Sequence, residues 1–253
     1  MTNIEKLVDI VKTLRSPNGC PWDIEQTHKS CKSGLIEESY EAAEAIDKND
    51  FNLLKEELGD VLLQVVFHSQ IAQENGEFNF DDVCMEIVTK LVVRHPHVFG
   101  NVRAENADDV LKNWDKNKKE KKSQTYTDTL KDVPISLPAL MRAQKIGKRA
   151  ANANLDFQVV DDTISALESE IIELKSAISD NSNIAEEIGD VLFSVVNIAR
   201  HLKIDAEDAL LTSTNKFIDR FEKVECAVKK DGFDLQNLSA VDLDTYWINA
   251  KAE

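Results

Sequence analysis

The chain has little glycine, proline, cysteine or aromatic residue, and these shortages narrow its fold. Its 253 residues include 8 glycines and 5 prolines, and 6% are aromatic. Apolar residues recur at three- and four-residue intervals along most of the length, which predicts an all-α fold. The four cysteines form no C-x-x-C pair, which favours a reducing compartment and a cytoplasmic location. No apolar run is long enough to cross a bilayer, and no signal-peptide pattern opens the chain.

The charge balance restricts the partners. Against 30 lysines and arginines stand 46 aspartates and glutamates, a formal net charge of -16. A surface of this sign repels phosphodiester backbones and anionic lipids. We therefore expect neither a nucleic acid polymer nor a membrane as the main partner.

An acidic signature occurs twice. It consists of E-x-x-E followed by E-x-x-D, and its positions are Glu38, Glu41, Glu57 and Asp60, then Glu170, Glu173, Glu187 and Asp190. Residues 56–62 (EELGDVL) reappear 130 positions later as residues 186–192 (EEIGDVL). A match of this length and order predicts two related units in tandem.

The periodicity predicts two four-helix-type units, residues 1–122 and 139–253, joined by a linker over residues 123–138. The expected helices cover residues 4–14, 32–48, 51–75 and 80–93, then 140–151, 161–178, 184–202 and 206–228. The dense apolar surface of the 51–75 segment indicates a helix buried on several sides.

Each signature suits a divalent cation. Residues three apart share a helix face, so two antiparallel helices would direct four carboxylates at one point. Oxygen-only ligands suit Mg²⁺, with Mn²⁺ as a substitute, and Mg²⁺ sites are commonly completed by substrate phosphates. A di-iron bundle would repeat E-x-x-H, which occurs near a site only at Glu25 and His28. Iron is therefore disfavoured.

Pairs of basic residues also recur. Lys90 and Arg94 parallel Lys216 and Arg220, each pair spanning one helical turn. These side chains could bind phosphate oxygens or simply balance charge on acidic helices. No G-x-x-x-x-G-K-[ST] phosphate loop occurs anywhere.

Further motifs make the sequence recognisable. They are GCPWD at 19–23, QTH at 26–28, RHPHVFG at 94–100 and LPALMRAQK at 137–145. Together with the acidic pairs they closely resemble the MazG nucleoside triphosphate pyrophosphohydrolases over essentially the whole chain. The resemblance implies Mg²⁺-dependent hydrolysis of ribo- and deoxynucleoside triphosphates to monophosphate and pyrophosphate, by water attack at the α-phosphorus.

The resemblance also implies residue roles and an assembly. The eight signature carboxylates would be the metal ligands and catalytic groups, one glutamate orienting or deprotonating the water. Lys216, Arg220, Trp247 and Lys251 would contact the nucleotide in the second unit, and a homodimer is usual in the family. The chain departs from the family at Asn154, where a glycine is common, and at Ala166 and Asn183, where lysines are expected.

Two other functions fit the same residues. A noncatalytic regulator could use the tandem units to bind metal or nucleotide and hold a partner. A purely structural helical scaffold would be indifferent to both Mg²⁺ and nucleotide.

Overall fold

The computed structural model describes residues 1–100 and 125–252, and all regular structure in these ranges is helical. The chain divides into two compact units, Met1–Lys118 and Lys119–Glu253. The boundary falls within 101–124, outside the described residues. No helix in the described ranges is both long and apolar enough to cross a membrane. The all-α, tandem prediction is confirmed.

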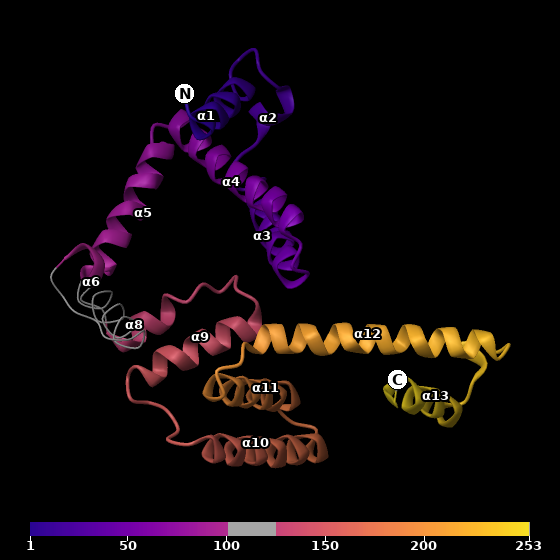
Figure 1. Ribbon diagram of the computed structural model, residues 1–253. Coiled ribbons are helices and arrows are strands. Elements are labelled where there is room, and N and C mark those ends of the chain that lie inside the picture. The colour runs from indigo at the N-terminus through magenta and orange to yellow at the C-terminus, as the bar shows by residue number, and fades with distance from the viewer. Residues whose placement is uncertain (101–124, 253) are drawn as a thin grey trace. The chain divides into compact units, whose positions relative to one another are not determined.

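Unit 1 is built around one antiparallel helix pair. Its helices are α1 (Asn3–Leu14), α2 (Pro21–Glu25), α3 (Lys32–Asp47), α4 (Phe51–Glu74), α5 (Phe80–Arg94) and α6 (Pro96–Phe99). α3 lies along α4, and α1 packs on the C-terminal half of α4 (Figure 1). All four long helices predicted for this unit are present, within two residues at each end.

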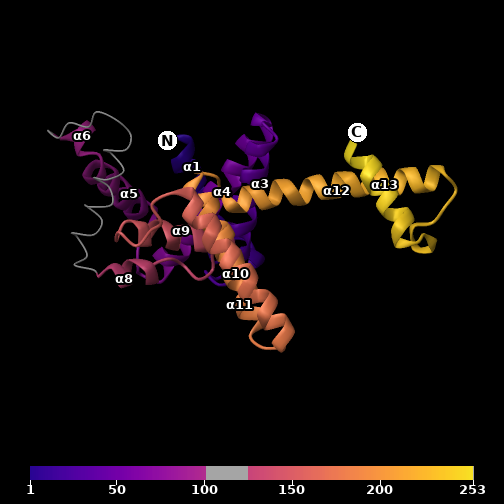
Figure 2. The same ribbon diagram turned by 90° about the horizontal axis from the view of Figure 1, so that it is seen from below.

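Unit 2 repeats this plan and extends it. Its elements are α8 (Tyr126–Lys131), α9 (Ala139–Ala151), α10 (Val160–Asp180), α11 (Ile184–His201), α12 (Ala206–Lys230), the 3-10 turn η1 (Leu235–Asn237) and α13 (Ala240–Ala252). α10 and α11 lie side by side in both views (Figures 1 and 2), and α9 packs on α11.

Two helices of unit 2 have no counterpart among the predicted elements. α8 lies within the segment expected to be a linker and packs on α9, where Arg149 donates a hydrogen bond to the Thr129 carbonyl. α13 packs on the end of α12 through Val224, Val228 and Ala250. Six residues are few for reading helical periodicity in α8, and the apolar residues of α13 do not gather on one face, so tertiary packing decides these two segments.

Side-chain caps and asparagines set the short connections between helices. The Asp50 carboxylate accepts the amides of Asn52 and Leu53 at the start of α4. Asn49, Asn181 and Asn183 adopt φ between 50° and 53° in the loops that join each helix pair. Asparagine tolerates this left-handed region better than most residues. These turns reverse the chain within a few residues and hold each pair antiparallel.

The apolar core of unit 1 is concentrated at one end of its helix pair. Val66, Phe67 and Ile71 of α4 are buried together with Val11 of α1. Toward the start of α4, Leu58 is 54% exposed. The prediction that this helix is buried on several sides is therefore wrong for its first half, because in the described residues that half packs on α3 and its opposite side faces solvent.

Arg15 joins three segments of unit 1. Its side chain is 5% exposed; Nη2 is 2.8 Å and Nε 3.0 Å from the Glu74 carboxylate. Nη1 donates to the carbonyls of Asp23 and Gln26, which belong to the family-like motifs. The Arg15 guanidinium holds the pKa of Glu74 below its usual value. The buried Arg15 guanidinium thus holds residues 23–26 close to the end of α4.

Replacing Glu74 with glutamine should destabilise unit 1, because it leaves the buried guanidinium without an anionic partner. We expect a loss of about 2 kcal/mol, below the usual cost for a fully buried pair since Glu74 is partly exposed. Urea denaturation of the full chain measures it, with the exposed Glu77→Gln as the charge-matched control. Equal stability of the two variants would contradict the assigned role of Arg15.

Candidate metal centre

In unit 1 the helix pair brings three signature carboxylates together. Glu38 and Glu41 project from α3 and Glu57 from α4, and one oxygen of each lies within 4.8 Å of the others. Ala42 and Ala45 are buried beside them on α3. Because alanine has a small side chain, α3 can approach α4 closely at the point where the carboxylates face each other.

Unit 2 forms the matching group. Glu170 of α10 and Glu187 and Asp190 of α11 have carboxylate oxygens within 4.8 Å of one another. Glu170 and Glu187 are half-buried, while Asp190 is exposed to solvent. The two clusters come from equivalent positions of the repeat but do not contain the same three members.

The fourth carboxylate of each signature lies close to its cluster. Repulsion from Asp60 contributes to a raised pKa at Glu38 and Glu57, and repulsion from Glu173 does so at Glu170 and Glu187. In all four glutamates desolvation is the largest cause of the raised pKa, and neighbouring carboxylates come next. All eight predicted residues therefore lie in or beside two acidic clusters.

The two loops explain the unequal spacing of the signatures. Fifteen residues separate Glu41 from Glu57, but thirteen separate Glu173 from Glu187. Glu57 lies in the second turn of α4, whereas Glu187 lies in the first turn of α11, three residues after its start. The partial positive charge at a helix N-terminus favours the ionised form of a first-turn glutamate. The clusters are thus alike in composition and different in local electrostatics.

The donor set fits a hard divalent cation. Every group in the two clusters is a carboxylate, without histidine or cysteine, as suits Mg²⁺ or Mn²⁺. A cation would remove the repulsion that raises the pKa of the glutamates, and a cation bound by only a few carboxylates can also accept phosphate oxygens.

The basic residues lie on other helices. Lys90 pairs with Glu86 at 3.2 Å on α5, and Arg94 ends that helix. Lys216 and Arg220 lie on α12, and Trp247 and Lys251 on α13, where the Trp247 ring is 5.0 Å from the Phe217 ring. Within the described ranges, no hydrogen bond or ion pair joins the lysines of this set, Arg220 or Trp247 to a cluster carboxylate.

Unit 2 contains a pocket that the sequence pattern did not predict. It is lined in part by Phe193 and Asn197, three and seven residues after Asp190 on α11. The available signal was a break in the repeat, because the 130-residue offset aligns Asn197 with Phe67. The repeat shows the residues that the two units share, whereas this pocket depends on a position at which they differ.

Comparison with known proteins agrees with this geometry. A sequence profile described as the MazG nucleotide pyrophosphohydrolase domain matches twice, at residues 26–99 and 158–225. The chain is 43% identical over 259 residues to the nucleoside triphosphate pyrophosphohydrolase of Escherichia coli K12, covering 100% of this chain and 98% of the relative.

Two further relatives show the same relationship. The Thermotoga maritima protein named nucleoside triphosphate pyrophosphohydrolase/pyrophosphatase MazG is 44% identical over 247 residues, covering 98% of this chain and 95% of the relative. A nucleoside triphosphate pyrophosphohydrolase of Mycolicibacterium smegmatis is 32% identical over 228 residues, covering 88% and 60%. The chain belongs to the MazG family and carries the family's domain in two copies.

Proposed function

We propose that the chain is a cytoplasmic, Mg²⁺-dependent nucleoside triphosphate pyrophosphohydrolase. It cleaves ribo- and deoxynucleoside triphosphates to the monophosphate and pyrophosphate, and water attacks the α-phosphorus. The observation that carries the proposal is the gathering of the signature carboxylates in each unit. The names of the relatives support the reaction. The four free cysteines support the cytoplasmic location.

The carboxylates have two roles in this reaction. Glu170, Glu173, Glu187 and Asp190 hold Mg²⁺ in unit 2, as Glu38, Glu41, Glu57 and Asp60 do in unit 1. When bound, the cation neutralises phosphate charge and lowers the pKa of water. A glutamate of the quartet would orient the attacking water or accept its proton.

The nucleotide contacts require a second chain. Lys216, Arg220, Trp247 and Lys251 in unit 2, and Lys90 and Arg94 in unit 1, bind nucleotide in the complete site. In the described part of the chain the four residues of unit 2 make no hydrogen bond or ion pair with a cluster carboxylate. We propose a homodimer in which the partner supplies them. We propose no membrane or nucleic acid polymer as a partner.

Exposed apolar faces on the helices support the homodimer. Large side chains are open to solvent on α5 (Met85, Ile87, Val88, Leu91), on α12 (Leu210, Leu211, Phe217, Ile218, Phe221) and on the metal helices (Leu58, Leu62, Ile188, Leu192). Gly59 and Gly189 lie among the last group, and a Cβ at either would meet no protein atom. A glycine in open space permits another backbone to approach closely.

A noncatalytic metal- or nucleotide-binding regulator is the second candidate. The departures Ala166 and Asn183 favour it, since each removes a lysine that the family resemblance leads us to expect. It predicts tight nucleotide binding without turnover.

Incubation with Mg²⁺ and a triphosphate should release pyrophosphate and monophosphate. The double variant Glu187→Gln/Asp190→Asn should lower turnover in unit 2 by more than about a hundredfold, since loss of supporting residues around a metal already costs 10–100-fold. Glu57→Gln/Asp60→Asn tests unit 1 in the same way, and ion-exchange chromatography identifies the products. Orthophosphate as the first product would refute the reaction, and full turnover in both variants would refute the ligands.

Addition of Mg²⁺ should raise the thermal midpoint of the wild-type chain. At a hundred times its dissociation constant, a cation specific for the native state adds about 2.7 kcal/mol. The double variant Glu57→Gln/Glu187→Gln should lose most of this rise. Without a cation it should be no less stable than wild type, because desolvation and neighbouring carboxylates disfavour the ionised form of both glutamates and raise their pKa. The exposed pair Glu77→Gln/Glu168→Gln is the charge-matched control.

Light scattering should give twice the chain mass of 28.4 kDa. Replacing Leu58 and Ile188 with aspartate places charges on the exposed apolar faces and should shift the mass to that of a monomer. Glu77→Gln/Glu168→Gln should remain dimeric. A wild-type monomer that turns over substrate would refute the shared site.

A further inference from the structure

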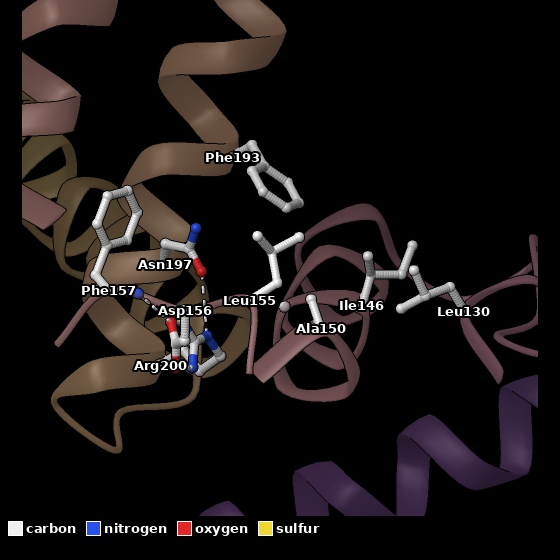
Figure 3. Close-up of a pocket in the computed structure, with 10 residues that line it drawn as sticks. Leu130, Ile146, Ala150, Leu155, Asp156, Phe157, Phe193, Asn197 and Arg200 are labelled. Atoms are coloured by element: carbon white, nitrogen blue, oxygen red, sulfur yellow. Dashed lines mark hydrogen bonds and ion pairs between the residues drawn. The ribbon is translucent and has the colours of Figure 1, made fainter. Parts of the chain in front are cut away.

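Unit 2 contains a pocket of about 470 Å³ between α9, α11 and the loop that follows α9 (Figure 3). Its apolar lining consists of Leu130, Ile146, Ala150, Leu155, Phe157 and Phe193. Asp156, Asn197 and Arg200 close its polar end. Leu155, Phe157 and Phe193 are each at least 40% exposed, so the pocket opens to solvent between aromatic rings.

Comparison of the repeats shows why unit 2 is hollow here. In unit 1, Val11 of α1 and Phe67 of α4 fill the space between their helices and are 0% and 8% exposed. In unit 2, α9 packs on α11 as α1 packs on α4, and its buried residue is Gly147. Asn197 stands at the position of Phe67. A Cβ on Gly147 would lie 3.1 Å from Asn197 Oδ1 and 3.1 Å from Arg200 Nε. Because glycine has no side chain, Asn197 and Arg200 can lie against α9 at this point.

Hydrogen bonds orient the Asn197 amide. Arg200 pairs with the Asp156 carboxylate through Nη1 at 2.9 Å and Nη2 at 2.5 Å, and His201 lies 3.0 Å from the same carboxylate. These partners, Arg200 foremost, lower the pKa of Asp156 to about 2, so the pair is ionised at neutral pH. Arg200 Nε donates to Asn197 Oδ1 at 3.1 Å. Because arginine only donates, the Asn197 NH₂ group is left with its donors free to face a ligand.

The pocket lies beside the acidic cluster on the same helix. Asn197 follows Asp190 by seven residues, which places it on the same face of α11 about 10 Å along the axis. Phe193 lies between them in sequence, and in Figure 3 its ring and that of Phe157 flank the Asn197 amide. This separation is of the order of the span from the α-phosphate of a nucleotide to the far edge of its base.

We propose that this pocket binds the nucleobase of the nucleotide whose phosphates lie at the unit 2 cluster. The inference rests on the proposed function for its occupant. The base stacks on the exposed aromatic rings, which accept any base, and the Asn197 amide donates to an acceptor on the edge of the base. Since Val11 and Phe67 fill the matching space of unit 1, base recognition of this kind belongs to unit 2 among the residues that the structure describes.

Calorimetric titration with Mg²⁺ tests the pocket without relying on turnover. The probes are the four ribonucleoside monophosphates and, as a base-free probe, inorganic pyrophosphate. Phe193→Ala removes a stacking surface and should weaken monophosphate binding about tenfold. Ala150→Leu fills the pocket and should weaken it at least as much, while pyrophosphate binds both variants as it binds wild type. Phe78→Ala, a similarly exposed phenylalanine of unit 1, is the control.

The outcomes separate this inference from the proposed function. Unchanged monophosphate binding in both pocket variants, or equal loss for monophosphate and pyrophosphate, overturns the pocket assignment even where wild type hydrolyses triphosphates. Base-dependent binding that the pocket variants lose, in a chain without turnover, supports the pocket and overturns the hydrolase.

Discussion

The main constraint on the structure is the repulsion among the carboxylates that two packed helices bring together. In each unit an antiparallel pair directs glutamates and an aspartate toward one point, and desolvation together with this repulsion raises the pKa of four glutamates. Contacts elsewhere along the helices must offset that cost. In unit 1, buried alanines of α3 and the apolar core at one end of the pair supply such contacts. A helix pair that tolerates such repulsion is prepared to bind a divalent cation.

The two units combine this shared constraint with different surroundings. In unit 1 the space behind the cluster is an apolar core, and Arg15 is fastened to Glu74 at its edge. In unit 2 the corresponding space is an open pocket, and the half-buried Arg200 pairs with Asp156 in the loop after α9. Asn154, with φ of 62°, turns the chain into that loop. Duplication thus preserved the acidic pair while the neighbouring packing diverged.

Exposed apolar surface links the fold to the proposed assembly. A chain of this size can normally bury the large side chains of its helices, yet several rows of them face solvent on α5, α12 and the metal helices. Lys90 and Arg94 lie on α5, and Lys216 and Arg220 on α12. In the proposed homodimer, a second copy that covers these faces supplies such residues to the site.

The sequence by itself determined the helices, the tandem plan and the acidic clusters. Helical periodicity is local, and E-x-x-E on one helix with E-x-x-D on the next can converge in few ways once a short loop joins them. The bounds of α1, α3, α4 and α5 were predictable for this reason. Tertiary structure alone decided which half of α4 is buried, that α8 and α13 form, and that Asn197 opens a pocket where Phe67 closes one. These features depend on contacts between residues far apart in the chain, and side-chain volume at one position has meaning only against the neighbour that it meets.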